Sequence, residues 1–341
     1  MTAVREEREQ VLDDLTIGAP KSARETLRSG AISIETLRLL CEVDDWRGAV
    51  DLVVTMASIL SVPVLYALLP NPLTAVFCVL LAIRNFNCAA QLVHESDHGT
   101  LLRHPTLNKM MGNLCSYMLG YTRSGHRQAH MDHHLYLNTA RDPDIILSQP
   151  EESGRKLLAN LLQDLVFVLA VKRFLQYFQS DPSNYSVLPW RTLSVAYFTR
   201  MLKPIGLVIL AQAGLFLVFA MTAGPTFYLW FHVLPIMTLY PFQIRVRSIA
   251  EHSFEPGYAP RLSDDIWVAR TSRLNMFERI IVAPFGQRYH YEHHVFPGVP
   301  NCNLAKVHRL LIDAGIPVPV NTSYFGFVTR KILMDLSGTA K

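Results

Sequence analysis

Long uncharged apolar stretches alternate with polar segments along this chain. Leu52–Leu69 and Leu73–Val93 lie close together, Pro204–Ala223 and Thr226–Ile244 follow later, and only Arg84 interrupts them with a charge. A helix needs about 20 mostly apolar residues to cross a bilayer, and a short turn with proline or glycine separates the members of each pair. The pattern therefore predicts an all-α integral membrane protein with four transmembrane helices in two hairpins.

The positions of the Lys and Arg residues predict the orientation of these hairpins. Seven lie in residues 1–48, 12 in residues 92–203 and 12 in residues 245–341, while neither hairpin turn holds any. Cytoplasmic loops of membrane proteins carry an excess of positive charge. We therefore expect a multi-pass protein with both termini and the long central segment in the cytoplasm, as in a bacterial inner membrane.

The remaining segments predict a helical cap on the cytoplasmic side. Residues 1–47 are polar with apolar residues at helical intervals, which indicates a soluble or interfacial helical lead-in. The membrane domain is expected to cover residues 48–320, followed by a C-terminal tail at 321–341. Leu157–Phe178 mixes apolar and charged residues and predicts an amphipathic helix in the interface, whereas Asn108–Tyr121 is short enough for a re-entrant segment.

The composition supports a membrane protein and argues against other classes. Half of the 341 residues are hydrophobic and 18% are charged, against about 25% in soluble domains. The net charge of +4 comes without a basic run interleaved with aromatic residues, which argues against nucleic-acid binding. The five cysteines contain no CxxC pair, so neither a disulfide framework nor a zinc ribbon is expected. The N-terminus lacks the apolar core of a cleaved signal peptide.

Three histidine clusters carry the candidate chemistry: His94-Glu-Ser-Asp-His98, His130-Met-Asp-His133-His134 and His290-Tyr-Glu-His293-His294. Histidines three or four positions apart lie along one face of a helix, whereas adjacent ones point about 100° apart and can serve different ions. Eight imidazoles exceed what one zinc site needs and suit two ions. Zinc, copper, iron and nickel all accept imidazole; four or five nitrogens per ion with an open position favour iron and oxygen chemistry.

The first cluster also permits other interpretations. It continues a polar stripe out of the second apolar stretch, formed by Arg84, Asn87 and Gln91, and such a stripe normally faces a helix bundle or a cavity. The same residues match H-E-x-x-H of metalloproteases, but an intramembrane protease would need an acidic ligand from another span and would leave the other clusters unexplained. A metal transporter would place its ligands within the spans, and these clusters lie outside them.

Together these motifs resemble the membrane fatty acid desaturase superfamily. The resemblance rests on the first cluster, R-Q-A-H-M-D-H-H with D-P-D at Asp142–Asp144, A-E-H-S-F around His252, Y-H-Y-E-H-H-V-F-P-G-V-P and N-L-A-K-V-H, and it covers roughly Leu52 to Leu311. It implies two irons, non-haem and held by histidine alone. The implied metal ligands are His94, His98, His130, His133, His134, His252, His290, His293 and His294.

The other histidines are expected to have secondary roles. His126 lies one turn before His130 but off the family pattern, so we expect it beside the ligands, and His104 and His308 are expected to be structural. His232 lies inside an apolar stretch, where it lines a substrate tunnel or, as we favour, hydrogen-bonds a neighbouring helix. Carboxylates beside the ligands can accept the second ring N–H or remain solvated; they are Glu95, Asp97, Asp132, Glu251 and Glu292.

The resemblance implies an oxidoreductase that uses O₂ and two electrons to remove hydrogen from an unactivated C–H bond. Desaturation of a fatty acyl or lipid-like chain is the favoured outcome. A hydroxylase or ketolase of a lipid or carotenoid uses the same ligands and is the alternative. The chain has no haem-binding H-P-G-G segment, flavin fingerprint or iron–sulfur cysteine spacing. We therefore expect a separate electron donor of the ferredoxin, rubredoxin or cytochrome b5 type on the basic cytoplasmic face.

Overall fold

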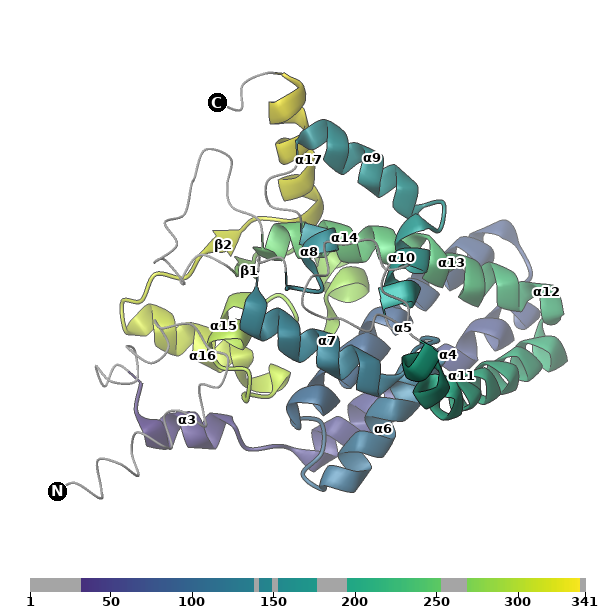
Figure 1. The fold of residues 1–341 in the computed structure, drawn as a ribbon, viewed down its shortest axis with the longest axis horizontal. Coiled ribbons are helices and arrows are strands. Elements are labelled where there is room, and N and C mark those ends of the chain that lie inside the picture. Colours follow the sequence, from purple (N-terminus) through teal and green to yellow (C-terminus); the bar gives the residue numbers. More distant parts are fainter. Residues whose placement is uncertain (1–31, 138–140, 149–152, 177–194, 253–268, 338–341) are drawn as a thin grey trace.

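The structure of the protein is a computed structural model that describes residues 32–137, 141–148, 153–176, 195–252 and 269–337. These residues are mostly helical, as predicted (Figure 1). Two short parallel strands, β1 (Thr271–Ser272) and β2 (Val320–Asn321), are the exception to an all-helical fold within these ranges. Of the expected lead-in, residues 1–31 lie outside the described residues, and α3 (Ile34–Leu40) is the helix that the structure places there.

The first apolar pair forms a helical hairpin. Helix α4 (Asp45–Leu68) packs against α5 (Pro72–His98) along its length. The Asn71 side chain caps α5 and a proline occupies its first position, which satisfies or removes N–H groups that have no partner inside the helix. Gly99 adopts φ 78° and ends α5 directly after His98, because glycine reaches the left-handed region without steric cost. The first histidine cluster therefore lies at the C-terminal end of this hairpin.

The second apolar pair is less regular than predicted. Helix α11 (Val195–Thr222) is followed by a helical path of four successive segments instead of one continuous helix. Pro235 lacks the N–H that a regular helix needs, and Thr238 leaves the helical region with φ −126° and ψ −76°. The segments of this path are α12 (Pro225–Tyr228), the π-helix η2 (Leu229–Val233), α13 (Leu234–Met237) and α14 (Leu239–His252).

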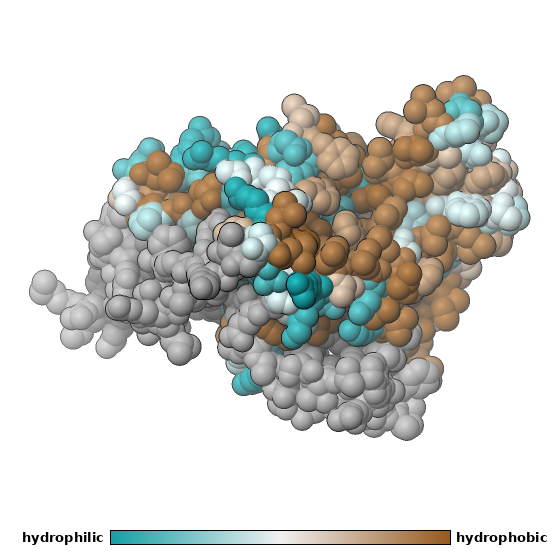
Figure 2. Space-filling model, turned by 90° about the horizontal axis from the view of Figure 1, so that it is seen from above, coloured by the Kyte–Doolittle hydropathy of each residue, from teal (hydrophilic) through white to brown (hydrophobic). Residues whose placement is uncertain are grey.

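Three helical regions are long and apolar enough to cross a membrane: Ile34–Leu68, Pro72–His98 and Ile205–Thr222. The fourth predicted span falls on the interrupted path after α11, so a four-span topology stays a prediction, as does its orientation. Hydrophobic residues cover the side of the molecule where α11 and α12 meet (Figures 1 and 2). Exposed apolar side chains of this kind include Val53, Leu60, Phe77, Leu210, Met221 and Trp230. Such an extended apolar surface indicates a membrane protein.

The remaining helices surround the histidine clusters. The predicted amphipathic helix at Leu157–Phe178 is divided at Phe167, whose φ is 69°, and its last two residues, 177–178, lie outside the described residues. Most of the short apolar segment at Asn108–Tyr121 belongs to α6, which ends at Met118. These elements are α6 (Pro105–Met118), α7 (Arg123–Tyr136), α8 (Ile145–Ser148), α9 (Gly154–Asp164), α10 (Val168–Gln176), η4 (Glu278–Val282), η5 (Pro284–Gly286), α15 (His290–Val295), α16 (Asn301–Asp313) and α17 (Tyr324–Leu336).

Two apolar cores fix the helices that carry the later histidines. Leu161 of α9, Ile249 of α14 and Phe327 of α17 belong to one buried cluster, so α17, within the segment expected to be a tail, packs against α14. Arg245 of α14 forms a buried ion pair with Asp164 of α9, with 2.6 Å between Nε and Oδ2. A second cluster joins α3, α15 and α16. Packing against several helices therefore holds α14 and α15 in place.

Candidate metal centre

All nine predicted ligands come together in the structure. They lie on four helices, α5, α7, α14 and α15, which meet near the middle of the molecule (Figure 1). They form two groups, and within each group one ring nitrogen per residue lies within 4.8 Å of the others. The first group is His94, His98, His130, His134 and His293, and the second is His133, His252, His290 and His294.

The first group joins five imidazoles through their Nε2 atoms. His293 Nε2 lies 3.0 Å from His94 Nε2 and 3.0 Å from His134 Nε2. His130 Nε2 lies 2.7 Å from His98 Nε2 and 3.2 Å from His134 Nε2. The five rings therefore point the same nitrogen at one another from three helices.

The second group has four imidazoles and a similar arrangement. His290 Nε2 lies 2.8 Å from His252 Nε2 and 3.0 Å from His294 Nε2. The His133 ring completes the group, with its centroid 4.8 Å from that of His252 and 5.3 Å from that of His294. The two groups adjoin, since the ring centroids of His134 and His294 are 4.4 Å apart.

Helical geometry explains how two short helices serve both groups. Adjacent residues of a helix point about 100° apart, and the structure divides each adjacent histidine pair between the groups. On α7, His134 joins the first group and His133 the second; on α15, His293 joins the first group and His294 the second. Each H-x-x-H-H motif therefore links the two groups.

Carboxylates orient two imidazoles of the second group. Asp142 is fully buried and accepts a hydrogen bond of 2.9 Å from His133 Nδ1. Because a carboxylate only accepts, the proton lies on Nδ1 and Nε2 keeps a free lone pair for a metal. Glu251 Oε2 lies 3.9 Å from His290 Nδ1. In the first group, Glu95 Oε1 lies 3.5 Å from His94 Nδ1, whereas the Nδ1 atoms of His134 and His293 are buried and have no hydrogen-bond partner among the described residues.

Burial keeps the imidazoles neutral. It lowers the pKa of His130, His134, His290, His293 and His294 well below the ordinary range, and the neighbouring histidines lower it further. A histidine binds a metal ion through a deprotonated nitrogen. These five imidazoles are therefore in the neutral form that binds a cation at neutral pH.

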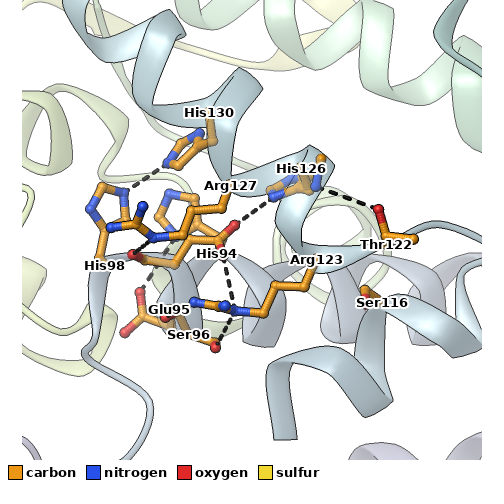
Figure 3. A network of polar contacts seen from close by, with 12 residues as sticks. His94, Glu95, Ser96, His98, Ser116, Thr122, Arg123, His126, Arg127 and His130 are labelled. Atoms are coloured by element: carbon orange, nitrogen blue, oxygen red, sulfur yellow. Dashed lines mark hydrogen bonds and ion pairs between the residues drawn. The ribbon is translucent and has the colours of Figure 1, made fainter. Parts of the chain in front are cut away.

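A polar network fixes α7 against α5 beside the first group (Figure 3). Asp97 of α5 lies 3.1 Å from Arg123 Nε and accepts a 2.7 Å hydrogen bond from His126 Nδ1. Arg123 also donates to the Ser96 hydroxyl at 2.8 Å. His126 thus lies next to the ligand groups but belongs to neither of them, and it holds the helix that carries His130.

The other histidines have identifiable structural contacts. His104 caps α6 by accepting from Leu107 N, and His308 Nδ1 donates to Glu292 Oε1 at 2.5 Å. His232 Nε2 donates a 3.1 Å hydrogen bond to Gln212 Oε1 of α11, which is the expected contact with a neighbouring helix. The His232 side chain also lines a cavity. The π-helix η2 carries His232, and such irregular turns often occur at functional sites.

The sequence interpretation missed two functional candidates. Asp142 was noted as part of a motif without a role, although its position directly after the second cluster was the available signal. Arg247 was not singled out, yet it lines the cavity close to the histidines. Nothing in the local sequence distinguishes it from Arg245, two residues earlier.

The donor set of both groups fits a pair of metal ions. Ligand atoms about 2.1 Å from an ion and at right angles to one another are roughly 3 Å apart, and the Nε2 separations in both groups are close to this value. Each group surrounds one centre with uncharged nitrogens, which suits a divalent transition metal. The structure thus provides two adjacent sites for histidine-bound ions.

Comparison with known proteins decides the family. The sequence model of the fatty acid desaturase family matches residues 70–322, which is well over half of the chain and includes all nine histidines. The chain belongs to the fatty acid desaturase family. A curated relative is the dihydrorhizobitoxine desaturase of Bradyrhizobium elkanii, which is 24% identical over 257 residues that cover 70% of this chain and 68% of the relative.

This desaturase family member has a large cavity that begins at its histidines. The cavity has a volume of about 900 Å³, and its lining includes His94, His133 and His290 of the histidine groups as well as Gln212 and His232. Residues of α11, α13 and α14 contribute to this lining, most of which is apolar. A long apolar cavity next to a candidate metal centre is typical of a substrate-binding site.

Proposed function

We propose that the protein is an O₂-dependent di-iron desaturase that introduces a double bond into a fatty acyl or lipid-like chain at the membrane surface. The observation that carries this proposal is the convergence of nine imidazoles into two adjacent groups at the end of an apolar cavity. Membership of the fatty acid desaturase family supports the reaction type.

The two histidine groups are the proposed ligands of the two irons. With O₂ and two electrons, the irons supply the oxidising power to remove hydrogen from an unactivated C–H bond. The protein positions them: His133 is fixed by Asp142, and α7 is fixed to α5 through Asp97. Burial keeps the imidazoles neutral, so no proton competes with the metal near pH 7.

The cavity is the proposed binding site of the substrate chain. Apolar side chains such as Ile209, Phe216 and Ile236 line it away from the histidines. An extended chain held along this lining presents one carbon to the metal centre, and such fixed positioning selects the bond that is oxidised.

The electrons are proposed to come from a separate protein of the ferredoxin, rubredoxin or cytochrome b5 type. Exposed basic side chains lie on the helices beside the first histidine group, among them Lys109 of α6 and Arg127 of α7. An acidic donor that docks here would transfer electrons more slowly at high salt, because exposed charges are screened.

Mass spectrometry of lipids from cells that express the chain with a ferredoxin and its reductase tests the reaction. A product two mass units lighter than its precursor is expected with the wild type and absent with His293→Ala. His104→Ala, which removes an exposed histidine outside both groups, is the matched control and should retain the product. A product heavier by one oxygen would contradict desaturation and indicate a hydroxylase.

A further inference from the structure

Helix α14 places one arginine in the cavity beside the histidine groups. Arg247 lies five residues before His252 and lines the cavity, and its side chain is 22% exposed. Its Nε lies 3.2 Å from Glu251 Oε2, one helical turn further on. Glu251 Oε1 accepts a 2.7 Å hydrogen bond from the Tyr324 hydroxyl. Glu251 and Tyr324 therefore fix one edge of the guanidinium.

Among the described residues, no side chain or backbone group hydrogen-bonds the other edge of this guanidinium. Within the described part of the chain, Glu251 is its one hydrogen-bonding or ion-pair partner, whereas an arginine has five N–H donors in a planar fork. Arg245 provides the contrast: both oxygens of Asp164 and the carbonyl of Ile146 occupy its guanidinium. Arg245 is thus a structural residue, and Arg247 keeps the donors on its terminal nitrogens.

A second polar side chain next to Arg247 also lacks a partner. Ser248 lines the same cavity and is 7% exposed, and its hydroxyl has no hydrogen-bond partner among the residues the structure describes. Buried polar groups are nearly always hydrogen-bonded in proteins. The unused donors of Arg247 and Ser248 therefore indicate a polar ligand at this end of the cavity.

This position lies beside the second histidine group. Glu251 Oε2 is 3.2 Å from Arg247 Nε and 3.9 Å from His290 Nδ1, so these two nitrogens are separated by no more than the sum of the two distances. An anion bound to Arg247 therefore lies near His290, one of the proposed metal ligands.

We propose that Arg247 binds a carboxylate of the substrate. This inference rests on the proposed function and narrows its substrate to a molecule whose oxidised carbon lies only a few bonds from a free carboxylate, such as a short fatty acid or an amino acid derivative. The planar fork matches the two oxygens of a carboxylate. Arg247 is the one Lys or Arg among the described cavity-lining residues, and Asp144 and Glu251 line the same cavity. One guanidinium beside two carboxylates suits a single negative charge and not a polyphosphate carrier.

Isothermal titration of the full chain in phosphatidylcholine nanodiscs tests this site with two probes. Octanoate and octanamide have the same length and differ in charge, and empty nanodiscs correct for partition into lipid. We expect the wild type to bind octanoate at least tenfold more tightly than octanamide, and Arg247→Gln to remove this difference. Arg84→Gln is the matched control: it removes a helical arginine that does not line the cavity and should keep the difference.

Arg247→Lys keeps the charge but lacks the fork, so it should bind octanoate more weakly than the wild type and more tightly than Arg247→Gln. If Arg247→Gln does not fold, this variant alone provides the test through a several-fold loss of the octanoate preference. Equal binding of the two probes to the wild type, or a preference that persists in both Arg247 variants, overturns the proposal.

The binding test is independent of turnover. If octanoate is preferred through Arg247 but expressing cells contain no oxidised product, the proposed reaction fails and the carboxylate site stands. If cells contain acyl chains desaturated far from any carboxylate and the two probes bind equally, the reaction stands and the carboxylate site fails.

Discussion

The two histidine groups differ in how their imidazoles are supported. The first group gathers five rings, and the buried Nδ1 atoms of His134 and His293 have no partner among the described residues. The second group gathers four, and Asp142 and Glu251 approach the outer nitrogens of His133 and His290. The cavity arginine contacts that same Glu251. Glu95 Oε1 also lies 3.5 Å from His94 Nδ1 in the first group, so the groups differ in the number of their ligands and in the hydrogen bond from His133 to the buried Asp142 in the second group.

Removing one ligand from each group gives the largest expected effect and tests this difference directly. His252→Ala leaves three imidazoles in the second group, whereas His98→Ala leaves four in the first, as many as the intact second group has. Both variants should lower turnover by about 100-fold or more, because even residues that only orient ligands contribute about 10- to 100-fold. His252→Ala should lose more iron, measured as iron per chain by mass spectrometry. Equal iron loss would remove the distinction between the groups.

Removing the carboxylate from the second group should have a smaller effect. Asp142→Asn replaces the acceptor that fixes the His133 tautomer, and we expect the iron affinity of the second group to fall about 10- to 100-fold. Competition with a chelator measures this affinity. Asp144→Asn is the matched control, because Asp144 Oδ2 lies 3.9 Å from His133 Nδ1 and its loss should change the affinity less. An effect of Asp144→Asn as large as that of Asp142→Asn would contradict the assigned role.

The stability of the metal-free protein should depend on pH, because both groups contain buried imidazoles with a lowered pKa. Burial lowers the pKa of His134 and His290, so below about pH 6.5, the usual histidine pKa, the unfolded chain binds protons that the folded chain does not. The free energy of unfolding then falls with decreasing pH, by up to about 1 kcal/mol per pH unit for each such imidazole. Thermal unfolding at pH 7.5 and pH 5.5 measures this fall.

The variants His134→Gln and His290→Gln, one from each group, compare the groups under the same conditions. Each removes one buried imidazole and should reduce the pH dependence by a similar amount, because burial is the main cause of both pKa shifts. A reduction in His134→Gln alone would show that the carboxylate beside His290 offsets the effect of burial there.

The sequence predicted the parts of the site that depend on local spacing. Histidines three and four positions apart must share a helix face, and adjacent ones must diverge, so two groups linked by His133-His134 and His293-His294 follow from the motifs. The resemblance to desaturases supplied the isolated His252, which no spacing rule connects to the others. The first hairpin was predictable because hydropathy and the Pro70–Pro72 turn are properties of neighbouring residues.

The tertiary structure decided which side chains meet across helices. The division into five and four imidazoles and the contact of Asp142 with His133 depend on how different helices pack together. The opposite roles of Arg245 and Arg247 depend on what packs against α14. Two arginines two positions apart on one helix carry the same local signal, and only their neighbours make one structural and the other a candidate ligand-binding residue.

The sequence thus determined the chemical type of the site, because metal ligation needs specific side chains at helical spacing. Its orientation and its cavity required the packed fold, because they arise from contacts between residues far apart in the chain.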